Sequence, residues 1–196
     1  MMLYKNLIEY SMGAIMIILE ILAVILVADF FAGFIHWAED AYAREDMPII
    51  GPFVAAPNVL HHKQPRAFLK KNWLQSSWDL LLGGALLVGA AAALGVLTWH
   101  VWLFAALVVM SNQVHKWSHQ GPREHWRVIT WLQKARVLQT PRQHAQHHRG
   151  ERNTHYCVIT NVLNPVLDRI GFWKGLEWYI ERTLGVKRRV EVVSPA

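Results

Sequence analysis

A long apolar run at residues 12–35 constrains this chain more than any other feature. About 20 apolar residues in a helix span the hydrocarbon core of a bilayer, so the run is long enough to cross a membrane. A signal peptide has a shorter apolar stretch that ends at a small-residue cleavage site. This run instead leads into His36 and Trp37. We therefore expect a retained transmembrane helix at about residues 12–36.

Two further apolar runs follow later in the chain. Residues 80–97 consist of Leu, Ala, Gly and Val without a charged side chain, and residues 101–114 form a third run that continues into a polar segment. A soluble bundle with buried helices is the alternative, but an uncharged stretch of this length favours the membrane. We expect spans at about 79–97 and 99–117. The sequence thus predicts an all-α integral membrane protein with about three transmembrane helices.

The distribution of basic residues predicts the orientation of these spans. With three spans, residues 39–76 and 118–196 lie on one side of the membrane, and the N-terminus and the turn at 98–100 lie on the other. Of the 20 Lys and Arg residues, only Lys5 lies on the N-terminal side. The positive-inside rule then makes the first face cytoplasmic and the N-terminus external or lumenal. We expect one membrane-embedded domain over 1–196, with a helical, histidine-rich cytoplasmic cap.

Composition excludes several other classes of protein. Only 17% of the residues are charged, whereas typical soluble domains have about 25%. Ten tryptophans bring more apolar surface than a disordered chain contains. The single cysteine, Cys157, excludes an intrachain disulfide and a cysteine-based zinc or iron–sulfur site. The formal net charge of +6 suits an anionic partner such as a phospholipid headgroup, and no nucleic-acid-binding motif accompanies it.

Histidine is the unusual component of the chain, with 11 residues. We interpret His100, His125 and His155 as residues of the membrane–water boundary. The others converge on the predicted cytoplasmic face, and several have helical spacings of three or four residues, which place imidazoles on one face of a helix. This converging set comprises His36, His61, His62, His115, His119, His144, His147 and His148.

Such a set predicts a metal centre. Imidazole nitrogens bind Zn, Cu, Fe and Ni. A catalytic zinc uses three protein ligands, so eight histidines are too many for one ion. We therefore predict two metal ions with about four nitrogens each. Soluble di-iron bundles use Glu with Glu-x-x-His pairs, but no Glu here has a His three residues later. A ligand set rich in His and poor in carboxylates is typical of membrane di-iron oxygenases. A transmembrane haem protein would instead place a His at mid-depth within a span.

Three polar residues accompany the predicted ligands. Asp29 and Asp40 lie seven residues before and four residues after His36, so they share a stripe of the helix with it. Carboxylates that accept a ligand's other ring N–H orient the imidazole. We expect this role for both, and Asp40 is also a candidate ligand. Asn112 lies three residues before His115, where it could hold a metal-bound water or help helices to pack.

These motifs resemble those of the Kua-type lipid desaturases, a family that includes plasmanylethanolamine desaturase and the plastid enzyme fatty acid desaturase 4. The resemblance covers about residues 29–185, in family order, and carries the family's eight-histidine set onto the eight histidines named above. In the wider membrane desaturases the first motif has two histidines, whereas Asp40 holds the second place here. The most specific shared segments are His36-Trp37-Ala38-Glu39-Asp40, His61-His62-Lys63-Gln64-Pro65, His115-Lys116-Trp117-Ser118-His119 and His144-Ala145-Gln146-His147-His148.

The resemblance implies O2-dependent removal of two hydrogens from a lipid chain by two non-haem irons. In the plasmanylethanolamine branch, the 1-O-alkyl chain of an ether phospholipid becomes a vinyl ether, which gives a plasmalogen. Acid–base groups cannot break such a C–H bond, so a redox metal must supply the oxidant. Electrons would come from a cytochrome b5-type or ferredoxin-type carrier docked on the basic face. An acyl-lipid desaturase or hydroxylase of the same fold, and a non-catalytic metal-binding membrane protein, are the alternatives.

Overall fold

The computed structural model describes the backbone of residues 2–189 and the side chains of residues 9–189, so the side chain of Lys5 and the end of the predicted cap at 190–196 lie outside the described residues. All regular secondary structure in the described part is helical, which confirms the all-α prediction. The elements are α1 (Met2–Tyr42), η1 (Gly51–Ala55), α2 (Ala56–Lys63), η2 (Ala67–Lys70), α3 (Trp73–Ala93), α4 (Trp99–Ser118), α5 (Arg127–Lys134), α6 (Pro141–His147), α7 (Leu163–Arg169) and α8 (Phe172–Leu184).

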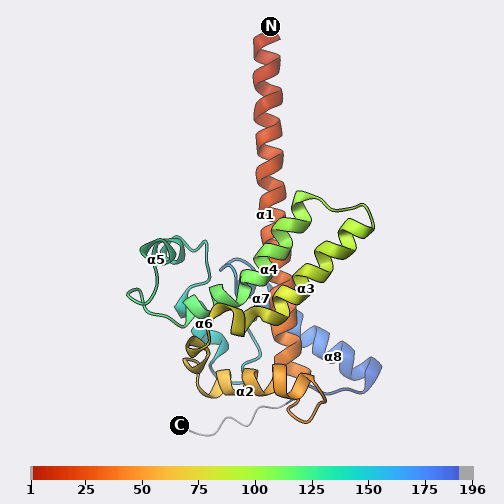
Figure 1. Cartoon of the computed structure of the whole chain (residues 1–196), viewed down its shortest axis with the longest axis vertical. Helices are drawn as coiled ribbons and strands as arrows, with labels where there is room; N and C mark the ends of the chain where they lie inside the picture. The colour runs from red at the N-terminus through yellow and green to blue at the C-terminus, as the bar shows by residue number, and fades with distance from the viewer. Residues whose placement is uncertain (1, 190–196) are drawn as a thin grey trace.

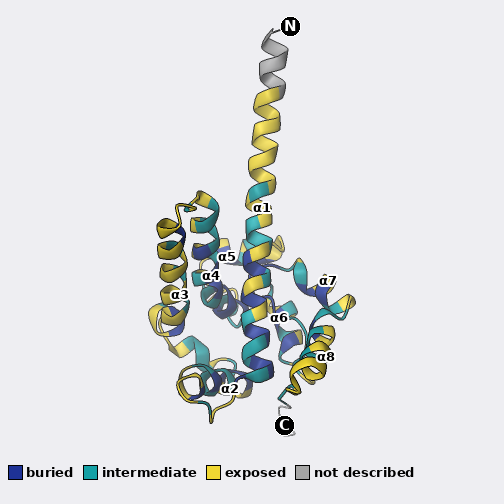
Figure 2. Ribbon diagram, turned by 90° about the vertical axis from the view of Figure 1, so that its right-hand side faces the viewer, coloured by how far each residue is buried: buried dark blue, intermediate teal, exposed yellow. Residues whose placement is uncertain are grey.

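Helix α1 is the axis of the molecule (Figure 1). Its N-terminal half extends away from the other elements with exposed apolar side chains, while its C-terminal half is largely buried (Figure 2). The helix continues past the predicted end at residue 36 because Ala38, Glu39 and Ala41 favour helix and the next proline is Pro48. His36 and the residues one turn later therefore lie on one continuous helix.

Helices α3 and α4 form an antiparallel hairpin beside α1 (Figure 1). α3 begins at Trp73, earlier than the predicted 79, because the side chain of Asn72 accepts a hydrogen bond from the Gln75 N–H, 2.8 Å away, in a reciprocal capping box. The two helices approach closely at Gly84, where a Cβ atom would lie 2.8 Å from Val109 Cγ2. Helix α4 matches the predicted third span to within one residue.

Two described helices are long and apolar enough to cross a membrane. They are Glu9–Tyr42, with a mean hydropathy of 2.7, and Trp73–Ala93, with a mean hydropathy of 1.4. Their side chains are mostly exposed, as expected for helices that face lipid. Both agree with predicted spans, while a third span in α4 and the orientation of the protein remain predictions.

The C-terminal segments pack around the lower half of α1. Trp37 of α1 stacks on Trp173 of α8, with 5.8 Å between ring centroids, in a core that includes Tyr156 and Cys157. The segment that carries Cys157 lies directly against Gly33, where an added Cβ would be 2.7 Å from the cysteine Sγ. A glycine at this position thus allows the segment after α6 to contact α1.

Candidate metal centre

The eight predicted histidines lie on or directly after the four helices α1, α2, α4 and α6, and their ring nitrogens come together. Figure 1 shows these helices near the C-terminal end of α1. All eight histidines are buried or half-buried. They form two groups, and within each group the candidate ligand atoms all lie within 4.8 Å of one another. The first group contains His61, His115, His119, His144 and His148, and the second contains His36, Asp40, His62 and His147.

The two pairs of adjacent histidines each divide between the groups. His61 and His62 lie in the last turn of α2, while His147 is the last residue of α6 and His148 is its C-cap. Adjacent side chains on a helix differ in direction by about 100°, so each pair directs one ring to each group. The paired rings remain close, with centroids 5.7 Å apart in α2 and 5.3 Å apart in α6. The groups are therefore neighbouring parts of one centre.

The nitrogens of the first group have the spacing of metal ligands. His144 Nε2 lies 2.9 Å from His115 Nε2, 2.8 Å from His119 Nε2 and 3.0 Å from His148 Nε2. A neutral imidazole has one N–H, so hydrogen bonds cannot satisfy this arrangement. Nitrogens about 2.1 Å from a metal lie about 3.0 Å apart in octahedral and about 3.4 Å apart in tetrahedral geometry. Both ring nitrogens of His61 are also buried without a hydrogen-bond partner among the described residues.

Asp40 is the centre of the second group. Its carboxylate lies 3.3 Å from both His62 Nε2 and His147 Nε2, and 3.7 Å from His36 Nε2. Asn58 Nδ2 donates a 2.6 Å hydrogen bond to Asp40 Oδ1, which fixes the carboxylate. The Oδ2 atom and His36 Nε2 have no hydrogen-bond partner within the described part of the chain. Both groups therefore fit a metal ion, the first through nitrogens alone and the second through three nitrogens and a carboxylate.

Backbone carbonyls orient two of these imidazoles. His36 Nδ1 donates to the carbonyl of Tyr156 at 3.0 Å, and His147 Nδ1 donates to the carbonyl of Thr154 at 2.9 Å. Each bond directs the Nε2 atom into the second group, as such bonds do for metal-bound histidines. Sequence reasoning missed these partners because a backbone carbonyl leaves no signal in the residue type.

The expectation for Asp29 requires correction. Its carboxylate accepts hydrogen bonds from the backbone N–H of Ile159 at 2.8 Å, and from the N–H and hydroxyl of Thr160 at 3.1 and 2.6 Å. The carbonyl of Tyr156, and not Asp29, orients His36. Asp29 instead attaches the segment after α6 to α1, so its influence on the histidines is indirect.

Asn112 and the three excluded histidines lie outside both groups. Asn112 Nδ2 donates to the carbonyl of Ser76, which joins α4 to α3 and supports the packing alternative. His100 lies 3.1 Å from Glu20, and His155 lies 2.9 Å from Asp168. His125 contacts the carbonyl of Trp126.

Burial keeps histidines of the first group uncharged. It lowers the pKa of His119 to about 3, with a smaller contribution from His147, and lowers the pKa of His144 well below its usual range. The pKa of His61 is lowered for the same reason. A metal requires the neutral imidazole, so these rings are in the ligating form at neutral pH.

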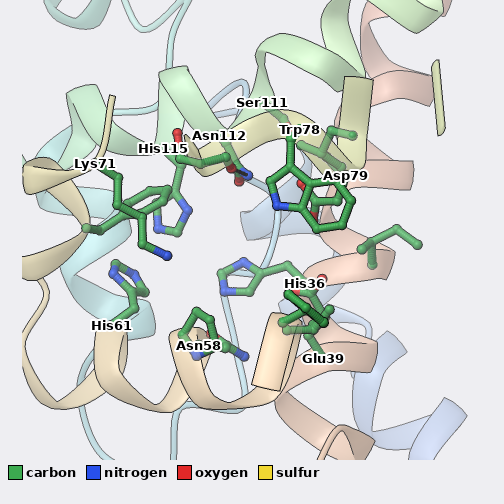
Figure 3. Close-up of a pocket in the computed structure, with 18 of the residues that line it drawn as sticks. His36, Glu39, Asn58, His61, Lys71, Trp78, Asp79, Ser111, Asn112 and His115 are labelled. Carbon is green, nitrogen blue, oxygen red and sulfur yellow. Dashed lines mark hydrogen bonds between the residues drawn. The ribbon is translucent and has the colours of Figure 1, made fainter. Parts of the chain in front are cut away.

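A cavity of about 240 Å³ opens onto the centre (Figure 3). His36 of the second group and His61 and His115 of the first group form part of its wall. Apolar side chains such as Leu80 and Val108 form another part. A molecule in this cavity would therefore contact both groups from a partly apolar environment.

Comparison with known proteins identifies the family. Residues 25–191 match the family model of the lipid desaturase domain. The chain belongs to this family. The match confirms the resemblance drawn from the histidine motifs, and it includes all residues of both metal-binding groups. No solved structure matches the chain.

Two relatives of this chain are named plasmanylethanolamine desaturase. The chain is 31% identical to plasmanylethanolamine desaturase 1 of Mus musculus over 189 residues, covering 90% of this chain and 69% of the relative. It is 26% identical to plasmanylethanolamine desaturase of Myxococcus xanthus, covering 93% and 66%. It is also 31% identical to chloroplastic fatty acid desaturase 4 of Arabidopsis thaliana, covering 84% of this chain and about half, 51%, of that relative.

Proposed function

We propose that this chain is a di-iron desaturase that converts the 1-O-alkyl chain of plasmanylethanolamine to a vinyl ether. The single observation that carries the proposal is the cavity whose wall includes histidines of both metal-binding groups. A lipid chain in that cavity would lie beside two metals at once. The two relatives named plasmanylethanolamine desaturase support the choice of substrate.

The residues of the chain have separable roles in this proposal. The histidines and Asp40 would hold two irons, which supply with O2 the oxidant for an unactivated C–H bond. Asp40 adds the negative charge that the second group needs to balance a cation. The apolar wall at Leu80 and Val108 excludes water and fixes the lipid chain against the histidines.

The position of the cavity suits a phospholipid. The carbons next to the glycerol lie just below the headgroup, near the membrane surface. The cavity is lined by the C-terminal part of α1 and the N-terminal part of α3, so it lies where both candidate membrane helices reach the same side of the molecule. In the proposed orientation this end is cytoplasmic, because the basic residues concentrate there. A cytochrome b5-type or ferredoxin-type carrier would deliver electrons to that basic face.

An acyl-lipid desaturase is the second candidate function, since fatty acid desaturase 4 has the same 31% identity to this chain as the mouse relative, over a shorter match. The products distinguish the candidates. Expression in a plasmalogen-free host that contains alkyl ether phospholipid should yield acid-labile vinyl ethers, whereas a new acyl double bond or a hydroxylated chain would support the alternatives.

The matched variants are His119→Ala, in the first group, and His125→Ala, outside both groups. We expect the first to abolish the vinyl ether and the second to retain it. Zinc alone in the purified protein, or full product from His119→Ala, would contradict the proposal.

A further inference from the structure

The cavity contains two carboxylates that neither metal-binding group uses. Glu39 of α1 lies one turn after His36, and Asp79 lies near the start of α3 (Figure 3). Among the described residues, neither carboxyl group has a hydrogen-bond or ion-pair partner. Two carboxyl groups that face one cavity without a basic partner of their own favour a ligand that donates hydrogen bonds to them or carries a positive charge.

Aromatic rings accompany these carboxylates. Trp78 and Phe53 line the same cavity and contact each other edge to face, with centroids 6.1 Å apart. Trp78 is the direct neighbour of Asp79, and its ring lies beside the Asp79 side chain in Figure 3. The faces of aromatic rings attract ammonium groups, with tryptophan the strongest. Carboxylates with adjacent aromatic faces are suited to an organic ammonium group.

A positive group lies on the opposite side of the cavity. The side chain of Lys71 enters it across from Glu39 and Asp79 (Figure 3). Lys116 Nζ donates hydrogen bonds to the carbonyls of Lys71 and Asn72, at 2.6 and 3.2 Å, which fixes the backbone there. Arg66, five residues before Lys71, is instead paired with Glu124. The cavity thus has a negative and a positive side, which matches a zwitterion.

The charged sides meet at the proposed reaction centre. His36 and His61, both more than nine-tenths buried, line the cavity between them, and His36 Nε2 has no hydrogen-bond partner in the described part of the chain. A phospholipid that places its headgroup against these charges would bring the carbons next to its glycerol to the histidines. The charged groups of the cavity would therefore position the substrate lipid at the histidines.

We propose that Glu39 and Asp79 select a phospholipid with a primary-amine headgroup, which they bind through its ammonium group while Lys71 binds its phosphate. This inference rests on the proposed function and specifies its substrate. Trp78 and Phe53 complete the ammonium site. A glycerol headgroup can donate hydrogen bonds from its hydroxyls but has no positive charge, so it lacks the ionic attraction to the two carboxyl groups. A choline headgroup has the charge but no N–H to donate.

Lipid binding tests the inference independently of catalysis. Native mass spectrometry of the metal-free protein in detergent would measure competition between ether lipids with ethanolamine, choline and glycerol headgroups. We expect the wild type to prefer ethanolamine, and Glu39→Gln and Asp79→Asn each to reduce the preference over glycerol about tenfold, the effect of one lost charge-assisted hydrogen bond. Glu181→Gln, an exposed carboxylate on α8, is the matched control and should retain the preference.

Turnover by the iron-loaded protein completes the test. The same two variants should raise KM for the ethanolamine lipid more than KM for the glycerol lipid, whereas Glu181→Gln should leave both KM values unchanged. An unchanged headgroup preference in both variants overturns the inference, whether or not the protein desaturates lipid. A retained preference for ethanolamine without any desaturated product contradicts the proposed function and leaves the headgroup site supported.

Discussion

Replacement of Asp40 by Asn should weaken metal binding in the second group alone. Asn keeps the shape of the side chain and can still accept the hydrogen bond from Asn58, but it removes the charge that faces His36, His62 and His147. Two unit charges about 4 Å apart interact by about 4 kcal/mol at an effective dielectric constant of about 20. We therefore expect at least a hundredfold loss of affinity, about 2.8 kcal/mol.

The assay is iron titration against a competing chelator, with the metal content measured after dialysis. Asp40→Asn should retain one iron in the first group, where wild type retains two. Asp29→Asn is the matched control, because Asp29 is equally buried on the same helix, at 0% exposure against 2%. It should keep both irons but lose about 1–3 kcal/mol of folding stability, since its new amide cannot accept every hydrogen bond from Ile159 and Thr160. Wild-type iron affinity in Asp40→Asn would refute the reasoning.

Three further predictions concern the same centre. His61→Ala and His62→Ala should each weaken a different iron site, so their Mössbauer spectra should lose different components, and identical losses would contradict the division of the pair. Gly33→Ala should lower the unfolding temperature by an amount equivalent to about 1–3 kcal/mol, because its Cβ would contact Cys157, and an unchanged Tm would argue against that close approach. Metal-free protein should lose stability as the pH falls from about 6.5 toward 3, since the unfolded chain binds more protons there than the folded chain, in which burial lowers the pKa of His119 to about 3. Equal unfolding midpoints at about pH 7.5 and pH 5 would disagree with this.

Spacing along the chain was sufficient to predict which histidines share a face of a single helix. His115 and His119 are one turn apart, and so are His144 and His148, and the structure places both pairs in the first group. Apolar length was likewise sufficient to find the two long helices α1 and α3. These features belong to single elements, where the helical period determines which side chains share a face.

Partners that come from different elements were not predictable in this way. Asp29 shares a stripe of α1 with His36, yet its hydrogen bonds go to Ile159 and Thr160, far along the chain. The helical period describes α1 but says nothing about the segment that packs against it. For the same reason the sequence did not indicate that Asp79 of α3 shares a cavity with Glu39 of α1.

The division of adjacent histidines shows a second limit. His61-His62 and His147-His148 are each a single motif in the sequence, and their residue types are identical. Only the directions of α2 and α6 toward the centre determine which ring enters which group. The structure also places Asp40 in the second group, as a fourth candidate ligand beside three histidines. The first group contains only histidines.

Iron analysis of the purified protein combined with X-ray absorption at the iron edge tests the central claim most directly. The account predicts two irons per chain, each coordinated mainly by imidazole nitrogens. The absorption spectrum should also contain iron–iron scattering from the neighbouring metal. A single iron per chain, or irons surrounded mainly by oxygen with no neighbouring metal, would contradict it.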